Sequence, residues 1–453
     1  MAQPLYMALL LLLVYPALVI ASILADASKK RLLGLISTTT YSLLSILLVP
    51  ALVAGGLPAR INLPLGIGLY ADIFSTVYVL TSSIIVLVAG IYTYIRYSSI
   101  SDGRFAKYGV LSLLLYATSL LVLTDNWLVF AVLWEAISFI AYYMILSTSR
   151  DTGPHYTYYL TMHITGFMIL VGAALLYADN AYDMTRSTGE TLVVPALLLA
   201  AGFVSKAGVF PFHYWVQQVY DNIEPLYSAL FSGIVDPLGV YGLYRLASAM
   251  RLPENYVWLL VSLSLVSMII SIIWYWGARR LSSMLAWSTI YNMSWMVLAL
   301  TLPGMGALAL LLPLYIMCHG LSKASAFMTM GVYGGDYGRI RRLYPHAGFL
   351  LAASILAVEG APPFNLFIAK IMILKNTFAS MGVAAVVPVL AWFVSSLFFF
   401  RILASILFPG EGASGEGMGY SPGLLDALIA MMIVLNVFAY WIVSCIAGGG
   451  AII

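Results

Sequence analysis

Long apolar stretches alternate with short polar or Gly/Pro-marked breaks from Leu9 to Ile442. A helix needs about 20 mostly apolar residues to cross a bilayer, and roughly fourteen segments meet that requirement. We predict spanning helices over Tyr6–Ala25, Leu33–Ala54, Phe74–Ile95, Tyr108–Leu123, Trp127–Leu146, Tyr158–Tyr177, Leu192–Phe212, Leu226–Ala247, Val257–Trp276, Leu281–Leu300, Gly306–Val332, Leu350–Asn376, Val383–Leu407 and Leu424–Cys445.

Composition supports this pattern, because 62% of the residues are hydrophobic and only 9% are charged. Such a chain has too few polar groups to cover a water-soluble surface. No polar linker divides it, so we predict one all-α polytopic membrane domain over residues 1–453. The net charge of +3 is small, and no basic stripe is present, so we expect lipid as a partner and not nucleic acid.

Basic residues are distributed unevenly between alternate loops, which predicts the orientation. One set of loops contains Lys29, Lys30, Arg31, Arg104, Lys107, Arg150, Arg279, Arg280, Arg339, Arg341 and Arg342. The opposite set holds little beyond Arg60, Arg186 and Arg251. Because cytoplasmic loops are rich in Lys and Arg, we predict a multi-pass protein of the cytoplasmic or inner membrane with both termini on the non-cytoplasmic side.

Several ionisable residues fall inside the predicted spans, where each costs about 2.5–3.5 kcal/mol on the insertion scale. Such residues usually face a partner, a cavity or an ion path. His319 and Lys323 are four residues apart, on one face of a helix, where a proton could pass between them through one water. The set comprises Glu135, Lys206, Asp236, His319, Lys323, Glu359 and Lys370.

Proline interrupts the two spans that carry Lys206 and Lys370. Pro211 follows the first lysine, and Pro362 and Pro363 precede the second. Interrupted helices at corresponding places in two halves indicate a mid-membrane site in inverted-repeat transporters. We therefore predict a discontinuous seventh and twelfth helix beside a hydrated channel.

Each buried ionisable residue also has a structural interpretation. Glu135 could form a structural ion pair, Lys370 could extend toward the membrane surface, and Glu359 could only cap the helix break. His163 has no partner at helical spacing, so we interpret it as structural. The two cysteines and the missing nucleotide and metal motifs predict no cofactor, no metal and no redox centre on this chain.

Six motifs, in order, resemble the antiporter-like subunits shared by respiratory complex I (NADH:quinone oxidoreductase), membrane-bound hydrogenases and Mrp-type sodium/proton antiporters. They cover about Asp125 to Lys370. In order, they are DNWLVFAVLWE ending at Glu135, KAGVFPFHYW from Lys206, YSALFSG from Tyr227, RRLSSMLAWSTI, HGLSK with its His-x-x-x-Lys spacing, and GAPPFNLFIAK ending at Lys370.

The resemblance implies two inverted five-helix repeats, at 106–250 for helices 4–8 and 255–410 for helices 9–13. Residues 1–105 would form helices 1–3, and 411–453 the last helix. It also implies that Glu135 and Lys206 act as a charge pair, and that His319 and Lys323 pass protons to Lys370. Separating the pair would then favour loss of the lysine proton.

One departure from the family pattern affects the middle of this relay. Where the family usually has an eighth-helix lysine, this sequence has Pro237, with Asp236 immediately before it. Asp236 could carry protons, contribute to a sodium site, or merely pair with Lys206 or Lys323. All three interpretations are open at this stage.

The sequence therefore predicts a proton- or sodium-translocating member of a multisubunit redox or antiporter complex. Its relay would comprise Glu135, Lys206, Asp236, His319, Lys323 and Lys370. Partners would be other membrane subunits and peripheral redox subunits, so the chain would be a non-catalytic part of any oxidoreductase. The alternatives are a non-conducting structural paralogue, an independent solute carrier and a quinone-handling subunit.

Overall fold

The computed structural model describes residues 13–62, 68–97, 107–149, 151–186, 192–301, 305–408 and 423–448. Nine helical stretches within these ranges are long and apolar enough to cross a membrane by length and composition. Four further apolar helices are shorter. The structure is thus a mostly helical membrane protein, while the count of fourteen spans stays a prediction. Arg104, Arg150 and the start of the first predicted span lie outside the described residues.

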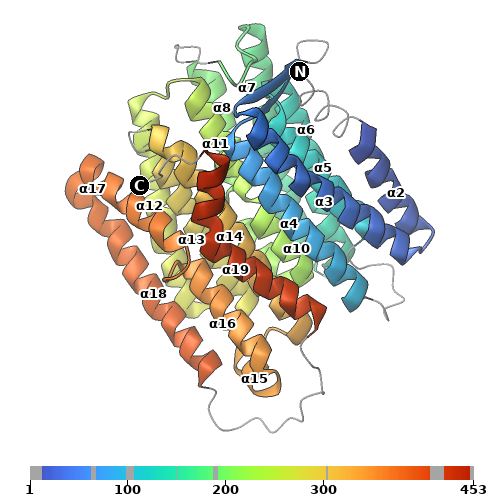
Figure 1. Cartoon of the computed structure of the whole chain (residues 1–453). Helices are drawn as coiled ribbons and strands as arrows, with labels where there is room; N and C mark the ends of the chain where they lie inside the picture. The colour runs from blue at the N-terminus through green and yellow to red at the C-terminus, as the bar shows by residue number, and fades with distance from the viewer. Residues whose placement is uncertain are drawn as a thin grey trace.

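The first half of the chain forms helices that alternate in direction, joined on one side by a short β-hairpin (Figure 1). The elements are α2 (Tyr15–Ala27), α3 (Arg31–Gly55), β1 (Ala59–Asn62), β2 (Gly68–Ala71), α4 (Ile73–Arg96), α5 (Tyr108–Leu123), α6 (Trp127–Thr148), α7 (Gly153–Ala178), α8 (Val193–Lys206), α9 (Tyr214–Asn222), α10 (Pro225–Leu230), the π-turn η3 (Phe231–Val235) and α11 (Pro237–Ala249).

The second half continues the bundle. Its elements are α12 (Glu254–Gly277), α13 (Leu281–Leu300), α14 (Met305–Tyr333), α15 (Tyr337–Leu343), α16 (Pro345–Glu359), α17 (Leu366–Met381), the 3-10 turn η4 (Gly382–Ala385), α18 (Val386–Leu407) and α19 (Leu424–Ile446). In Figure 1, α14 lies in the middle of the bundle, and it packs against α4, α10, α16 and α19.

The two ends of the bundle differ in charge. The upper end in Figure 1, here called the hairpin end, carries β1 and β2, and the described basic residues there include Arg60, Arg186 and Arg251. The other end, here called the basic end, carries the α2–α3 turn at the right of Figure 1 and α15 at its bottom. Its described basic residues include Lys29, Lys30, Arg31, Lys107, Arg279, Arg280, Arg341 and Arg342.

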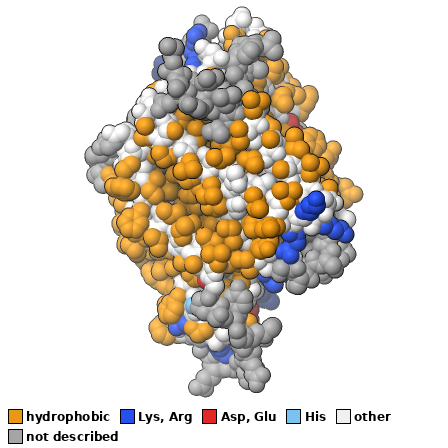
Figure 2. Space-filling model, turned by 45° about the vertical axis from the view of Figure 1, so that its right-hand side comes forward, with side chains coloured by type: hydrophobic (Ala, Val, Ile, Leu, Met, Phe, Trp, Pro, Cys, Tyr) orange, Lys and Arg blue, Asp and Glu red, His pale blue; other side chains and the backbone are white. Residues whose placement is uncertain are grey.

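Hydrophobic side chains cover most of the middle of the face drawn in Figure 2. Large apolar residues are exposed on the outer helices, for example Phe167 on α7, Phe393 on α18 and Trp441 on α19. By contrast, the α4 and α14 spans are 89% and 94% buried inside the protein. An apolar outer belt around a buried polar interior is the arrangement that a lipid solvent requires.

Both predicted helix interruptions are present. α8 ends at Lys206 and α9 begins at Tyr214, while α16 ends at Glu359 and α17 begins at Leu366. Each break contains a glycine with positive φ, Gly208 at +66° and Gly360 at +79°. Glycine adopts this conformation without the steric cost of a Cβ, which explains why each helix ends there.

The β-hairpin is an element that the helical interpretation missed. β1 and β2 pair antiparallel, with Arg60 opposite Tyr70. The strands have four residues each and lie between two spans, so they give no apolar run long enough to detect. The hairpin leads directly into α4, which Asp72 begins by accepting a hydrogen bond from the Ser75 backbone.

Candidate functional site

Five ionisable side chains are fully buried in the centre of the bundle. All five have an exposed fraction of 0%. They are placed by helix ends and by one central helix: the end of α8, the residue between η3 and α11, two positions on α14, and α17. Groups this costly to bury need partners or water. The five are Lys206, Asp236, His319, Lys323 and Lys370.

Lys206 and Glu135 do not pair with each other, and each contacts a different side chain. Lys206 Nζ donates to Ser138 Oγ at 2.8 Å and lies 4.4 Å from the centre of the Trp134 ring. Glu135 Oε2 lies 3.4 Å from Nδ1 of His163 on α7. The two charges still interact electrostatically across a longer distance. Lys206 is therefore positioned by a hydroxyl and an aromatic ring and does not form a direct ion pair with Glu135.

Asp236 lies between the lysines of the two halves. Its Oδ2 accepts a 2.5 Å hydrogen bond from Tyr220 on α9. Its Oδ1 is buried and, within the described residues, has no hydrogen-bond partner. The carboxylate interacts electrostatically with both Lys206 and Lys323. Asp236 thus connects them without a direct ion pair to either.

The two residues of the His-x-x-x-Lys motif on α14 differ in their contacts. Lys323 Nζ donates to the Leu285 carbonyl at 2.5 Å and to Ser288 on α13. Neither ring nitrogen of His319 has a hydrogen-bond partner among the described residues. Since buried polar atoms are almost always satisfied by protein or ordered water, His319 marks a place where water is needed.

Lys370 on α17 is the last of the five buried ionisable residues along the chain. Its Nζ donates to the Glu359 carbonyl oxygen at 2.6 Å and lies 5.0–5.8 Å from the ring centres of Tyr291, Trp295 and Trp392. The Glu359 carboxylate instead accepts hydrogen bonds of 2.9 Å from two α18 serines, Ser395 and Ser396. Glu359 also lines a cavity of about 190 Å³ at the helix break.

A larger cavity, of about 880 Å³, opens at the basic end. Asp221, Glu224, Arg279 and Arg280 are among the charged residues that line it. Tyr220, the hydrogen-bond donor to Asp236, lines the same cavity. The cavity therefore reaches from the basic end to a side chain that contacts the buried carboxylate.

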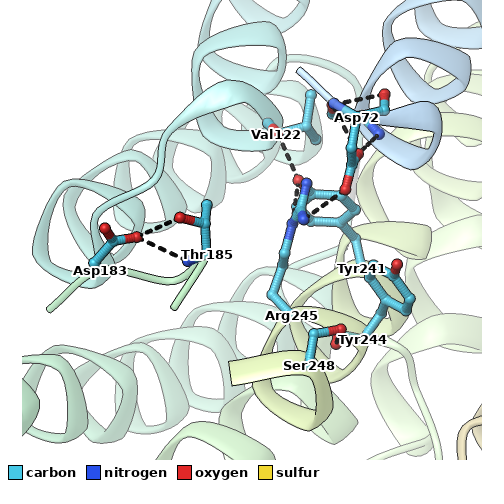
Figure 3. Close-up of polar contacts among 9 residues, drawn as sticks. Asp72, Val122, Asp183, Thr185, Tyr241, Tyr244, Arg245 and Ser248 are labelled. Atoms are coloured by element: carbon cyan, nitrogen blue, oxygen red, sulfur yellow. Dashed lines mark hydrogen bonds and ion pairs between the residues drawn. The ribbon is translucent and has the colours of Figure 1, made fainter. Parts of the chain in front are cut away.

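A cluster of ion pairs fastens the hairpin end. Arg60 on β1 pairs with Asp125 at 2.7 Å and with Asp183 at 2.9 Å. Figure 3 shows Asp183 also accepting hydrogen bonds from Thr185. Burial raises the pKa of the Asp183 carboxyl, but hydrogen bonds from Thr185 and Arg60 outweigh it, so the pKa is lowered overall. This cluster joins the hairpin to the loops before α6 and after α7.

Some contacts of the site were missed by sequence reasoning. His163 pairs with Glu135, although it has no partner at helical spacing, because the contact joins two helices. Ser138 follows Glu135 by three residues and so lies near it on the helix surface, which was a usable signal. Tyr220, which donates to Asp236, was not among the predicted site residues. Within the described residues, no group of three or more His, Cys, Asp or Glu side chains is placed to hold a metal.

Comparisons with known proteins place the chain in a family. The family model described as "NADH:quinone oxidoreductase/Mrp antiporter, TM" matches residues 124–398. The chain is 26% identical to NADH-quinone oxidoreductase subunit N of Pelobacter propionicus, covering 66% of this chain and 70% of the relative. It is also 25% identical to hydrogenase-4 component B of Escherichia coli, over 71% of its own length and 52% of that protein.

A Na(+)/H(+) antiporter protein of Alkalihalophilus pseudofirmus is a further relative, 26% identical over 69% of this chain. The match covers 44% of that protein, so this chain spans less than half of its length.

The fold agrees with these sequence matches. A chain of the membrane-bound sulfane sulfur reductase, an archaeal respiratory membrane complex, superposes with a TM-score of 0.84 at 20% identity, covering 97% of this chain and 96% of that one. Motifs, family match and fold together show that this protein is an antiporter-like membrane protein and belongs to the NADH:quinone oxidoreductase/Mrp antiporter family.

Proposed function

We propose that this chain translocates protons as one subunit of a multisubunit membrane complex. The observation that supports this most directly is the set of fully buried ionisable residues at both helix interruptions and on the helices between them. A purely structural role rarely requires so many ionisable side chains in the interior, because each one costs free energy to bury. The relay would comprise Glu135, Lys206, Asp236, His319, Lys323 and Lys370.

Protons would enter from the basic end, which the positive-inside rule makes cytoplasmic. The cavity there supports this entry, because its wall includes Tyr220, and Tyr220 donates a hydrogen bond to Asp236. Asp221 and Glu224 in the cavity wall would offer carboxylates to an entering proton, next to Arg279 and Arg280. Asp236 would then take the place of the lysine that the family usually has in this helix.

The centre of the relay would be hydrated. Asp236 Oδ1 and both nitrogens of His319 lack partners among the described residues, so water would satisfy all three atoms. Water between them would carry protons from Asp236 toward Lys323, which interacts electrostatically with it. From there His319 would pass protons to Lys370, with which it also interacts.

Neighbouring subunits would supply the driving force. A redox reaction or an opposing ion gradient there would move the carboxylates relative to the lysines. For unit charges at an effective dielectric constant of about 20, moving from about 5 Å to about 10 Å apart weakens their attraction by about 1.7 kcal/mol. That change is enough to shift the occupancy of a lysine proton more than tenfold.

The division into repeats is part of this proposal. We assign helices 4–8 to residues 106–250 and helices 9–13 to 255–410, flanked by 1–105 and 411–453. The two interrupted helices, α8–α9 and α16–α17, support the assignment, since each would be the fourth helix of its repeat. The exposed apolar faces of the outer helices leave room for membrane partner subunits and lipid.

The test is ion transport by the assembled complex in vesicles, with pH- and sodium-sensitive dyes. Lys206→Ala and Lys370→Ala are expected to lower proton transport at least tenfold while the complex still assembles. Lys375→Ala is the matched control, because Lys375 is an exposed lysine on the same helix as Lys370, and it should transport normally.

Other outcomes would redirect the proposal. If the sodium dye responds and the pH dye does not, the transported ion is sodium. If both buried-lysine variants assemble and transport like the native chain, the relay is refuted, and the chain is a non-conducting structural member of its complex.

A further inference from the structure

A second row of polar side chains runs from Asp236 toward the hairpin end, along the contact between α4 and α11. Asp236, Tyr241 and Arg245 follow one another at spacings of five and four residues. Nine residues of helix rise about 13.5 Å, close to half of the roughly 30 Å hydrocarbon core. The row is therefore long enough to cross the half of the hydrocarbon core between Asp236 and the hairpin end.

The contacts along this row are close. Tyr78 on α4 donates a 2.5 Å hydrogen bond to the carbonyl of Ile234, two residues before Asp236, and its ring centre lies 5.7 Å from that of Tyr241. Tyr241 Oη accepts a 2.7 Å hydrogen bond from Arg245 Nε. Arg245 Nη1 in turn lies 2.7 Å from Asp72 Oδ2, as Figure 3 shows.

Arg245 and Asp72 mark the end of the row nearest to water. The Arg245 side chain is 6% exposed and that of Asp72 is 17% exposed. Nη2 of Arg245 is buried and has no hydrogen-bond partner in the described part of the chain. An ion pair that only fastened α4 to α11 would gain little over apolar packing. The unpartnered guanidinium nitrogen indicates that water or a transported species is accommodated beside it.

We propose that this row is a proton route from Asp236 to the hairpin-end surface, with Asp72 as its last carrier and Arg245 as a positioning residue. The proposal rests on the proton translocation proposed above and adds an exit separate from Lys370. Together with the cavity that reaches Tyr220, the route would let protons cross through the first half of the chain.

The transfer balances as a proton relay. An O–H bond of protonated Asp236 breaks, and an O–H bond forms on Asp72. Between them, intervening water and the hydroxyls of Tyr78 and Tyr241 hand the proton on, each hydroxyl turning away from the backbone carbonyl to which it donates in the structure. Arginine does not release its proton in proteins, so Arg245 stays charged throughout. Its role is to hold the Tyr241 hydroxyl and the Asp72 carboxylate next to each other.

Arg245 would also favour release of the proton from Asp72. Protonating Asp72 removes the negative partner of a buried guanidinium, which is an unfavourable state. Asp72 would therefore lose its proton promptly to water at the hairpin end, and the ion pair would form again.

The experiment uses the whole complex in vesicles and measures proton transport per assembled complex. Tyr241→Phe removes the hydroxyl and keeps the ring. Asp72→Asn keeps the helix cap, since asparagine caps as well as aspartate, but removes the proton carrier. Asp72→Glu restores a carboxylate. Tyr15→Phe is the control, because Tyr15 is equally buried but lies on α2, where it packs against Tyr41.

We expect Tyr241→Phe and Asp72→Asn to lower transport about tenfold, Asp72→Glu to recover most of it, and Tyr15→Phe to transport normally. The route is overturned if Tyr241→Phe and Asp72→Asn assemble and transport like the native chain while Lys206→Ala does not. If Lys206→Ala and Lys370→Ala also transport normally, the failure belongs to the proposed function itself.

Discussion

The substitution Gly166→Ala tests whether the position of the Glu135 carboxylate matters. A Cβ on Gly166 of α7 would lie 1.5 Å from Glu135 Oε1, whereas ordinary contact begins at 3.4 Å. The carboxylate must therefore move by about 2 Å. Because the displaced atoms are the end of a flexible side chain, the stability cost should stay below about 1.5 kcal/mol.

The displacement has an electrical consequence. It moves Oε1 of the carboxylate whose Oε2 lies 3.4 Å from His163, and it changes the distance between that carboxylate and Lys206. For two unit charges near 6 Å apart at an effective dielectric constant of about 20, a further 2 Å changes the interaction by about 0.7 kcal/mol. That energy corresponds to a factor of about three in an equilibrium constant. We therefore expect proton transport to fall about threefold.

The assay is dye-monitored proton uptake by vesicles that contain equal amounts of assembled complex. Gly153→Ala is the control on the same helix, because a Cβ there would meet nothing within 4 Å. If Gly166→Ala acts through Glu135, it should have no further effect when Glu135→Gln is already present. The reasoning fails if Gly166→Ala transports as well as Gly153→Ala, or if its effect persists undiminished in the Glu135→Gln background.

Three further predictions concern other contacts. Ser138→Ala removes the hydrogen-bond acceptor of Lys206 and should lower proton transport several-fold in the same assay, with assembly unchanged. Tyr220→Phe removes the donor to Asp236 and should lower transport about tenfold, whereas normal transport would exclude entry by this side chain. The pKa of Asp183 is lowered in the folded protein, so the stability it contributes is present above its ordinary pKa of 3.8 and lost as the pH falls below it. Hydrogen exchange of the hairpin should therefore quicken in that range in the native protein, and Asp183→Asn should remove this pH dependence.

The sequence contained enough information to locate the helix breaks and the buried charges. Both follow from local signals, because a proline or glycine interrupts a helix wherever it lies, and an ionisable residue in an apolar run is costly in any fold. Lys206, Pro211 and Lys370 are therefore at or beside breaks in the structure as predicted. Hydropathy likewise predicted a membrane protein without any knowledge of packing.

Contacts between helices were not predictable in the same way. Which face of α7 turns toward α6 decides that His163 meets Glu135. The polar and apolar residues of α7 are not separated onto two faces, so its sequence pattern does not select one. Arg245 lies inside a predicted span but was left out of the predicted set. Its pairing with Asp72, far away in sequence, depends on how the helices pack. The β-hairpin was missed because its strands are four residues long.

The two interrupted helices apply the same physical solution to a buried lysine. Lys206 and Lys370 each donate to a neutral oxygen and lie against aromatic rings, while the nearby carboxylates of Glu135 and Glu359 contact other partners. A direct buried ion pair would hold the lysine proton firmly, since breaking such a pair costs about 3–5 kcal/mol. Contacts with a hydroxyl, a carbonyl and a ring face support a charged lysine more weakly, by about 1–3 kcal/mol each. A relay needs groups that can lose a proton when a carboxylate a few ångströms away moves, and this arrangement meets that need in both halves of the chain.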